Sequence, residues 1–234
     1  MLRTRTGLSA VILLQAAVAA LAADWPQWKQ NAGHLPGTPE ELPARLHLQW
    51  VRQLPAPGSA WPWTQYFLQF DASYEPVVMG KSIFVGSMVR DSVTAYDTGS
   101  GEEKWRFYAN APVRFAPVAN DGKLYVGSDD GCLSCLDAAS GEELWKLNAG
   151  PPKRKWILGN GRLISTHPVR GAPCLAGDRL YFAAGVYPFM GTFIHAYDTV
   201  KERLEWTNSG SGSVYILQPH HSPAFAVDVE MINR

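Results

Sequence analysis

Short runs of mixed apolar and polar residues recur along the chain, and turn residues separate them. KSIFVGS spans residues 81–87, VTAYD spans 93–97, and a Gly-Glu pair then precedes a run that contains Trp105. Short runs rich in β-branched and aromatic residues, bounded by Gly, Asp and Ser, are typical of β-strands joined by tight turns. We therefore predict an all-β fold of short antiparallel strands.

The whole set of runs is repeated. About 40 residues later KLYVGS, LSCLD and Trp145 follow in the same order, and RLYFAA, IHAYD and Trp206 form a third copy. The third copy is displaced further because the connection at 151–169 contains an insertion, and a fourth copy opens near residue 221. A repeat of this length indicates one supersecondary unit per copy. We expect four-stranded antiparallel units at about 74–109, 115–149 and 170–209, with a partial unit from 221.

The turn that follows the third strand of each unit begins with an aspartate, at Asp97, Asp137 and Asp198. An aspartate side chain accepts backbone N–H groups in a turn, and a glycine four residues later supplies a positive φ at no steric cost. The third copy reads DTVKE at 198–202 and has no such glycine. We expect its turn to differ from the other two.

Trp105, Trp145 and Trp206 lie on the last predicted strand of each unit. Burial of a tryptophan removes about 150–250 Å² from water. At about 25 cal/mol/Å² this is worth roughly 4–6 kcal/mol as an upper bound. We predict that these three side chains anchor each unit to its neighbour.

A strand that ends in AYD or CLD, a Gly-Glu turn and a Trp-bearing strand resemble the pyrroloquinoline-quinone repeat. DWPQW at 24–28, followed by LQW at 48–50, resembles the lead-in of large exported propellers of that family. The resemblance implies a lead-in at 23–45 and a partial β-propeller of about three blades plus fragments at 46–234. It also places Trp50 on an outer strand, at 46–54, that would complete the last blade of a ring.

Propellers close with about four to eight blades. We therefore expect the chain to be an N-terminal fragment of a longer protein, with the remaining blades of the same protein or other protein partners completing the fold. The alternative is a chain that assembles with other copies of itself.

The first residues predict the destination of the chain. Arg3 and Arg5 precede an apolar run at 8–21 and a small-residue cleavage pattern at 20–22, which together are typical of a secretory signal peptide at 1–22. That run is shorter than the roughly 20 residues a membrane-spanning helix needs. We expect secretion through the inner membrane to the periplasm or cell envelope, with no membrane span. The 21 basic and 21 acidic residues balance, which argues against binding to nucleic acid.

The three cysteines are expected to be structural. Cys132 and Cys135 lie on one predicted strand, where positions three apart point to opposite faces, and Cys174 follows a unit-opening proline. Family enzymes that use pyrroloquinoline quinone have a vicinal cysteine pair, a tryptophan beneath the quinone and a metal held by acidic and amide side chains. No such set stands out here, so pyrroloquinoline quinone with calcium is implied only by the resemblance, and we predict no catalytic residue.

The insertion carries the candidate ligand-binding residues Trp156, His167 and Arg170. A basic loop that bears a tryptophan suits an anionic or sugar-like small ligand, while the alternative is a solvated loop that covers a blade. His220 and His221, on a later connection, are also candidate ligand-binding residues. They would ligate a metal only with partners from elsewhere, so we predict no metal site. His195 lies on a predicted strand, and we expect it to point into water.

The leading interpretation is a non-catalytic binding or scaffold module of the periplasm or cell envelope. One alternative is a quinoprotein dehydrogenase whose catalytic parts lie in blades outside this chain. The other is a scaffold propeller of the outer-membrane assembly type.

Overall fold

The computed structural model describes residues 23–210, except for 39, 43, 69–70, 72, 154 and 187–189. The predicted signal peptide at 1–22, the partial unit from 221, and His220 and His221 lie outside the described residues. No helix in the described part of the chain is long and apolar enough to cross a membrane.

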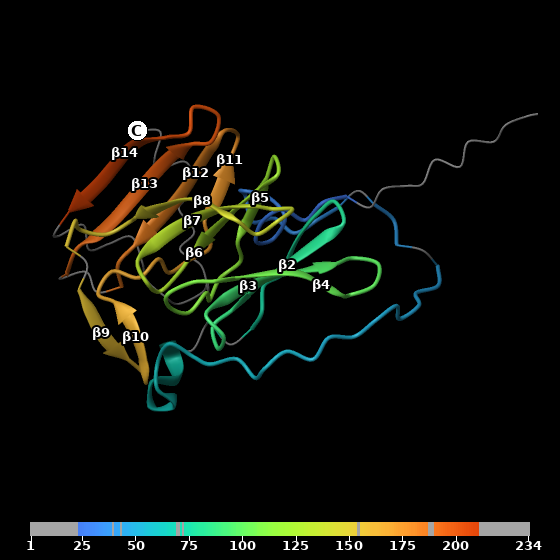
Figure 1. The fold of residues 1–234 in the computed structure, drawn as a ribbon, viewed down its shortest axis with the longest axis horizontal. Helices are drawn as coiled ribbons and strands as arrows, with labels where there is room; N and C mark the ends of the chain where they lie inside the picture. The colour runs from blue at the N-terminus through green and yellow to red at the C-terminus, as the bar shows by residue number, and fades with distance from the viewer. Residues whose placement is uncertain are drawn as a thin grey trace, which may run out of the picture.

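Three four-stranded antiparallel sheets lie side by side like the blades of a fan (Figure 1). The first blade consists of β1 (Val77–Met79), β2 (Ser82–Ser87), β3 (Ser92–Asp97) and β4 (Glu103–Tyr108). The second consists of β5 (Val118–Asn120), β6 (Lys123–Gly127), β7 (Cys132–Asp137) and β8 (Glu143–Asn148). The third consists of β11 (Cys174–Ala176), β12 (Arg179–Ala184), β13 (Thr192–Asp198) and β14 (Arg203–Gly210). The predicted all-β partial propeller is confirmed.

The hydrophobic core lies between neighbouring blades. One buried cluster joins the first blade to the second and includes Phe84 and Leu124, and another joins the second blade to the third and includes Tyr125 and Phe182. Leu124 and Tyr125 are successive residues of β6, and successive side chains of a strand point to opposite faces. The middle blade is therefore covered on both faces.

The lead-in crosses the first strand of every blade. Trp25 forms a β-bridge with Val78 of β1, and the backbone N–H of Ala119 in β5 donates to the carbonyl of Pro26 at 2.8 Å. The side-chain amide of Gln27 donates to the carbonyl of Leu175 in β11 and accepts its N–H. The segment DWPQW thus ties together the three strands on the inner side of the fan.

A tryptophan from one blade packs on the turn of the next. Trp105 of β4 covers Gly141, where an added Cβ would lie 2.5 Å from the indole, and its Nε1 donates to the carbonyl of Ala138 at 3.1 Å. Trp50 covers Gly101 in the same way and donates to the carbonyl of Thr98 at 2.9 Å. Residues 46–54 therefore contribute a tryptophan to the first blade as a preceding blade would, although they form no β-strand.

The same tryptophans face small residues across their own blades. Trp105, Trp145 and Trp206 are paired in register with Ala95, Cys135 and Ala196, and a β-bulge follows that small residue in all three blades. The indoles are half-buried rather than fully buried, so each contributes less stability than the upper bound for a fully buried tryptophan. Trp145 also lies 4.9 Å from Tyr197 of the third blade, centroid to centroid.

The expectation of a different turn in the third blade was wrong. Glu202 stands where the other blades have Gly101 and Gly141, and it adopts a φ of 52°. Asp198 accepts the N–H groups of Val200 and Lys201, as Asp137 accepts those of its own turn. The aspartate therefore sets the turn, and a non-glycine residue is held in the left-handed region at its end.

The insertion contains a two-stranded hairpin rather than only a loop. Strands β9 (Trp156–Gly159) and β10 (Arg162–Ser165) pair antiparallel around Asn160 and Gly161, whose φ angles of 44° and 79° match the turn that favours Asn-Gly. The hairpin lies beside a 3₁₀ helix, η1 (Trp63–Leu68), at one end of the fan (Figure 1).

Candidate ligand pocket at the loop end

The blade-to-blade connections and the turns between the second and third strands lie at one end of the blades, which we call the loop end. Arg114 lies in the connection before β5, Arg170 in the connection before β11, and Asp129 in the turn between β6 and β7. These side chains come from separate segments, and the packing of the blades brings them together beneath the hairpin.

A buried group of four charges lies at the centre of the loop end. Arg114 donates from Nε to Asp129 and from Nη1 to Asp71, both at 2.7 Å. Arg170 donates to the two oxygens of Asp129 from Nε at 3.0 Å and from Nη2 at 3.1 Å. We call Arg114, Arg170, Asp71 and Asp129 the Arg–Asp cluster. Buried charges need paired, hydrogen-bonded partners, and here two positive and two negative groups balance.

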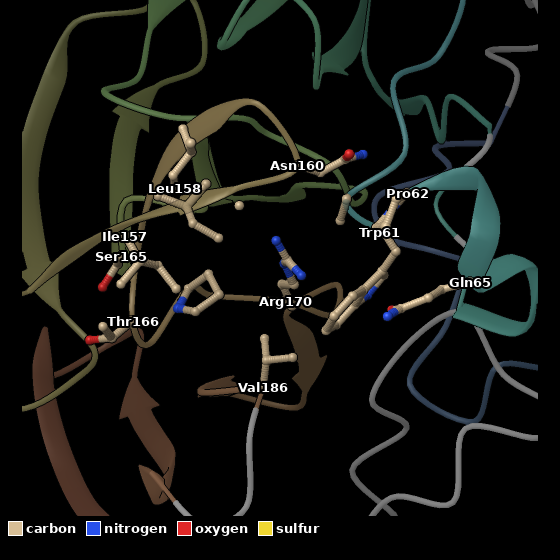
Figure 2. A pocket seen from close by; sticks show the side chains of 14 residues that line it. Trp61, Pro62, Gln65, Ile157, Leu158, Asn160, Ser165, Thr166, Arg170 and Val186 are labelled. Carbon is tan, nitrogen blue, oxygen red and sulfur yellow. The ribbon is translucent and has the colours of Figure 1, made fainter.

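A pocket of about 180 Å³ opens above the cluster, and we call it the loop-end pocket. Trp61, Pro62 and Gln65 form one wall, and Ile157, Ile164 and Ser165 of the hairpin form the opposite wall. The guanidinium of Arg170 lies between the two walls (Figure 2). Figure 2 also shows that both walls come from segments outside the four-stranded repeat.

Both walls of the loop-end pocket are fastened to the blades. Asp71 accepts the backbone N–H of Ala60 at 2.9 Å, which connects the Trp61 wall to the Arg–Asp cluster. On the other side, Arg162 of β10 pairs with Asp91 of the first blade, and Asn160 donates to the carbonyl of Ser59 at 2.9 Å. The hairpin belongs to the connection before the third blade, and it is therefore attached to the first blade as well.

The structure places the three candidate ligand-binding residues of the insertion in different surroundings. Arg170 is buried in the Arg–Asp cluster and faces the loop-end pocket. His167 lines a neighbouring, more open pocket of about 530 Å³ with Lys153 and Lys155. Trp156 lies on β9 with 41% of its surface exposed, and it lines neither pocket.

The two described histidines of this region are buried. Nε2 of His167 lies 2.9 Å from the carbonyl of Met190, and its Nδ1 lies 3.0 Å from Thr166 Oγ1. The expectation that His195 points into water was wrong, because it stacks on Phe182 with its ring centroid 4.7 Å away. Burial lowers the pKa of His195, and its hydrogen bond to the carbonyl of Ala149 opposes that effect.

Several residues of the site were missed from the sequence alone. Arg114 and Asp129 stand in ordinary connections between strands, and Trp61 lies in a proline-rich segment far from the insertion in sequence. A signal existed for the hairpin, because Asn160-Gly161 is flanked by apolar runs. No pattern in the sequence around Asp129 predicts that two arginines share its carboxylate.

The three cysteines are buried, and none of them forms a disulfide bond. Cys135 faces Trp145 across the second blade, and burial raises the pKa of Cys135 and of Cys174 to about 11. These thiols belong to the packing of the blades rather than to the loop-end pocket.

The described residues do not fit pyrroloquinoline quinone with calcium. Asp71 and Asp129 already bind arginines, and the described residues contain no group of three or more His, Cys, Asp or Glu side chains placed to hold a metal. The pocket of about 180 Å³ is also smaller than the roughly 300–1,000 Å³ usual for larger organic ligands.

Comparisons with known proteins agree with the fold. The family model described as outer membrane protein assembly factor BamB matches residues 17–166. The quinohemoprotein alcohol dehydrogenase from Comamonas testosteroni is 22% identical over 82% of this chain and 28% of its own, with a TM-score of 0.57. A europium-containing methanol dehydrogenase is 20% identical over 80% of this chain and 32% of its own, with a TM-score of 0.54.

The likeness to the two dehydrogenase structures shows the fold alone, at these identities. The chain spans less than a third of the length of either structure. No curated protein sequence matches the chain.

Proposed function

Because this chain belongs to the BamB family of pyrroloquinoline-quinone-repeat propellers, we propose that it is a binding module of the cell envelope that recognises a ligand at its loop end. Two observations support a location in the cell envelope, namely the family and the signal-peptide pattern at 1–22. The remaining blades of a propeller would then complete the fold around the same axis.

The observation that carries the proposal is the construction of the loop-end pocket. Its two walls are η1 with the preceding segment and the β9–β10 hairpin, neither of which the repeat needs. Both are held by specific contacts, from Asn160 to Ser59 and from Arg162 to Asp91. Binding residues gather on loops that a rigid scaffold positions, and here two added segments are fastened around one buried arginine.

Oxidation of an alcohol, which the names of the two similar dehydrogenases state, is a property of those proteins. In this chain the carboxylates nearest the pocket are bound to Arg114 and Arg170. Asp129 has an arginine on each of its oxygens, and a carboxylate bound in this way is poorly placed to become a metal ligand. Binding without oxidation therefore accounts better for the described residues.

The proposal is tested by ligand-observed NMR on the 234-residue chain, with a mixture of neutral sugars, carboxylates, phosphates and amino acids. The variant Val186→Trp fills the loop-end pocket from one side, and Val200→Trp places the same side chain on the exposed turn at the far end of the third blade. We expect at least one class of compound to bind, and its signal to disappear in Val186→Trp but not in Val200→Trp. Binding that both variants retain, or no binding at all, would refute the proposal.

A second measurement addresses the enzyme alternative. The chain is mixed with pyrroloquinoline quinone, calcium, a redox dye and either alcohols or sugars. We expect no dye reduction above the rate in buffer, because Asp71 and Asp129 stay with their arginines. Protein-dependent reduction of the dye would support a quinoprotein dehydrogenase instead.

A further inference from the structure

The loop-end pocket is close to electrically neutral. Arg170 is the one charged residue among the described residues that line it, and Asp129 binds that arginine through both of its oxygens. Arg114 is similarly balanced by Asp71 and Asp129. A free anion entering the pocket would therefore add an uncompensated negative charge beside a cluster that is already balanced.

Arg170 still has hydrogen-bond donors to offer. A guanidinium carries five N–H groups, and the side of Arg170 formed by Nε and Nη2 is occupied by Asp129. The structure records no hydrogen bond from Nη1 to a described residue, and the guanidinium is directed between the walls of the pocket (Figure 2). A planar pair of donors of this kind suits two neighbouring oxygen atoms of one ligand.

The wall opposite the hairpin adds an aromatic ring and an amide. Trp61 is half-buried and lies with its ring 6.0 Å from the guanidinium carbon of Arg170. Gln65, which lies four residues further along the chain, projects toward the pocket (Figure 2), and its side-chain amide makes no hydrogen bond with a described residue. The amide both donates and accepts, as a ligand hydroxyl does, and the indole offers a flat apolar surface.

We propose that the loop-end pocket binds a neutral sugar ring, with Trp61 covering one face and Arg170 and Gln65 bonding to its hydroxyls. This inference rests on the proposed function and names the ligand class of the same pocket. A volume of about 180 Å³ lies below the roughly 300–1,000 Å³ of sites for drug-sized ligands, which suits one small ring rather than a long chain. The ligand is therefore a monosaccharide or the terminal unit of a saccharide.

The experiment is isothermal titration calorimetry of the 234-residue chain with neutral monosaccharides, and separately with acetate, citrate and phosphate. We expect sugar binding at millimolar concentrations, which a change from about 0.05 M to about 0.5 M salt leaves unaltered. Anion binding would weaken over the same range because salt screens charges. Tighter binding of the anions than of every sugar would overturn the sugar assignment and leave the proposed binding function standing.

Three variants separate a contact in the pocket from a change of fold. Trp61→Ala should weaken sugar binding by at least about tenfold, while Trp63→Ala, which removes an indole that is 82% exposed and does not line the pocket, should change it less than about twofold. Arg170→Lys keeps the charge and loses the planar pair of donors, so it should also weaken sugar binding by about tenfold. Equal affinities in Trp61→Ala and Trp63→Ala would refute the inference even if Arg170→Lys failed to fold. Absence of any binding, to sugars and anions alike, would refute the proposed function as well.

Discussion

The packing of tryptophan on the turn of the next blade is tested by adding one methyl group at Gly141. Trp105 covers this glycine, whose φ is +77°, and a Cβ built there would lie 2.5 Å from Cε3 and 2.6 Å from Cδ2 of the indole. Carbon atoms in good contact are about 3.5–4.0 Å apart, so Gly141→Ala forces the indole or the turn to move. Gly122 lies in another turn of the same blade with a φ of +73°, but nothing lies within 4 Å of its added Cβ.

The two alanine variants share one cost and differ in another. Both place a non-glycine residue in the left-handed region, at roughly 1–2 kcal/mol. Only Gly141→Ala also overpacks the interface between two blades, which typically adds about 1–3 kcal/mol. We therefore expect Gly141→Ala to lower the free energy of unfolding by about 1–3 kcal/mol more than Gly122→Ala does.

Urea unfolding followed by tryptophan fluorescence measures both values on the 234-residue chain. The difference between the midpoints, at an unchanged slope, reports the difference in stability. Equal destabilisation by the two variants would mean that Trp105 does not pack on the turn of the second blade. The interface between the first two blades would then have to be held in another way.

Three further outcomes follow from the same structure. Asp129→Asn should lower the free energy of unfolding by about 3 kcal/mol or more, because it leaves Arg170 buried without its carboxylate. Glu103→Gln, which removes an exposed carboxylate from its pair with Arg106, should cost less than about 1 kcal/mol, and equal losses in chemical denaturation would contradict this reasoning. All three cysteines should resist a thiol reagent in the native chain and react in urea, because they are buried and burial raises the pKa of Cys135 and Cys174 to about 11. Rapid labelling of the cysteines in the native chain would show that the blades are loosely packed. Burial lowers the pKa of His195, so the folded state binds a proton on this side chain less readily than the unfolded state does. The free energy of unfolding should therefore be unaffected by His195 above about pH 6.5 and should fall as the pH drops below that value. His195→Gln should flatten this loss in thermal melts between about pH 6.5 and pH 5, and an unchanged pH profile would argue against a buried histidine.

The blades could be predicted because each one repeats the same local chemistry. A strand that ends in aspartate, a tight turn and a tryptophan strand are all visible in the order of residues, and Ala95 and Cys135 show that the position opposite the tryptophan must be small. The turn at Glu202 was misjudged because a glycine was taken as necessary. The hydrogen bonds of Asp198 and the strands on either side impose that turn at the cost of an unfavourable φ.

The loop-end pocket was only partly predictable. Arg170 was recognised from the composition of the insertion, but its partner Asp129 lies 41 residues earlier and Trp61 lies further still. Only the packing of the blades brings these segments together, and no local pattern records that packing. The same reason explains the wrong prediction for His195. Its place on a strand suggested that it points into water, but the end of the neighbouring second blade covers it, and its ring bonds to the carbonyl of Ala149.

The indole N–H signals of the chain, labelled with ¹⁵N-tryptophan, test the role of the loop-end pocket most directly. Assigned by single Trp→Phe variants, they are followed while a compound that binds is titrated. The signal of Trp61 should shift progressively, and those of Trp105 and Trp145, which lie between the blades, should remain in place. Shifts confined to Trp105 or Trp145, with Trp61 unmoved, would place the binding site elsewhere.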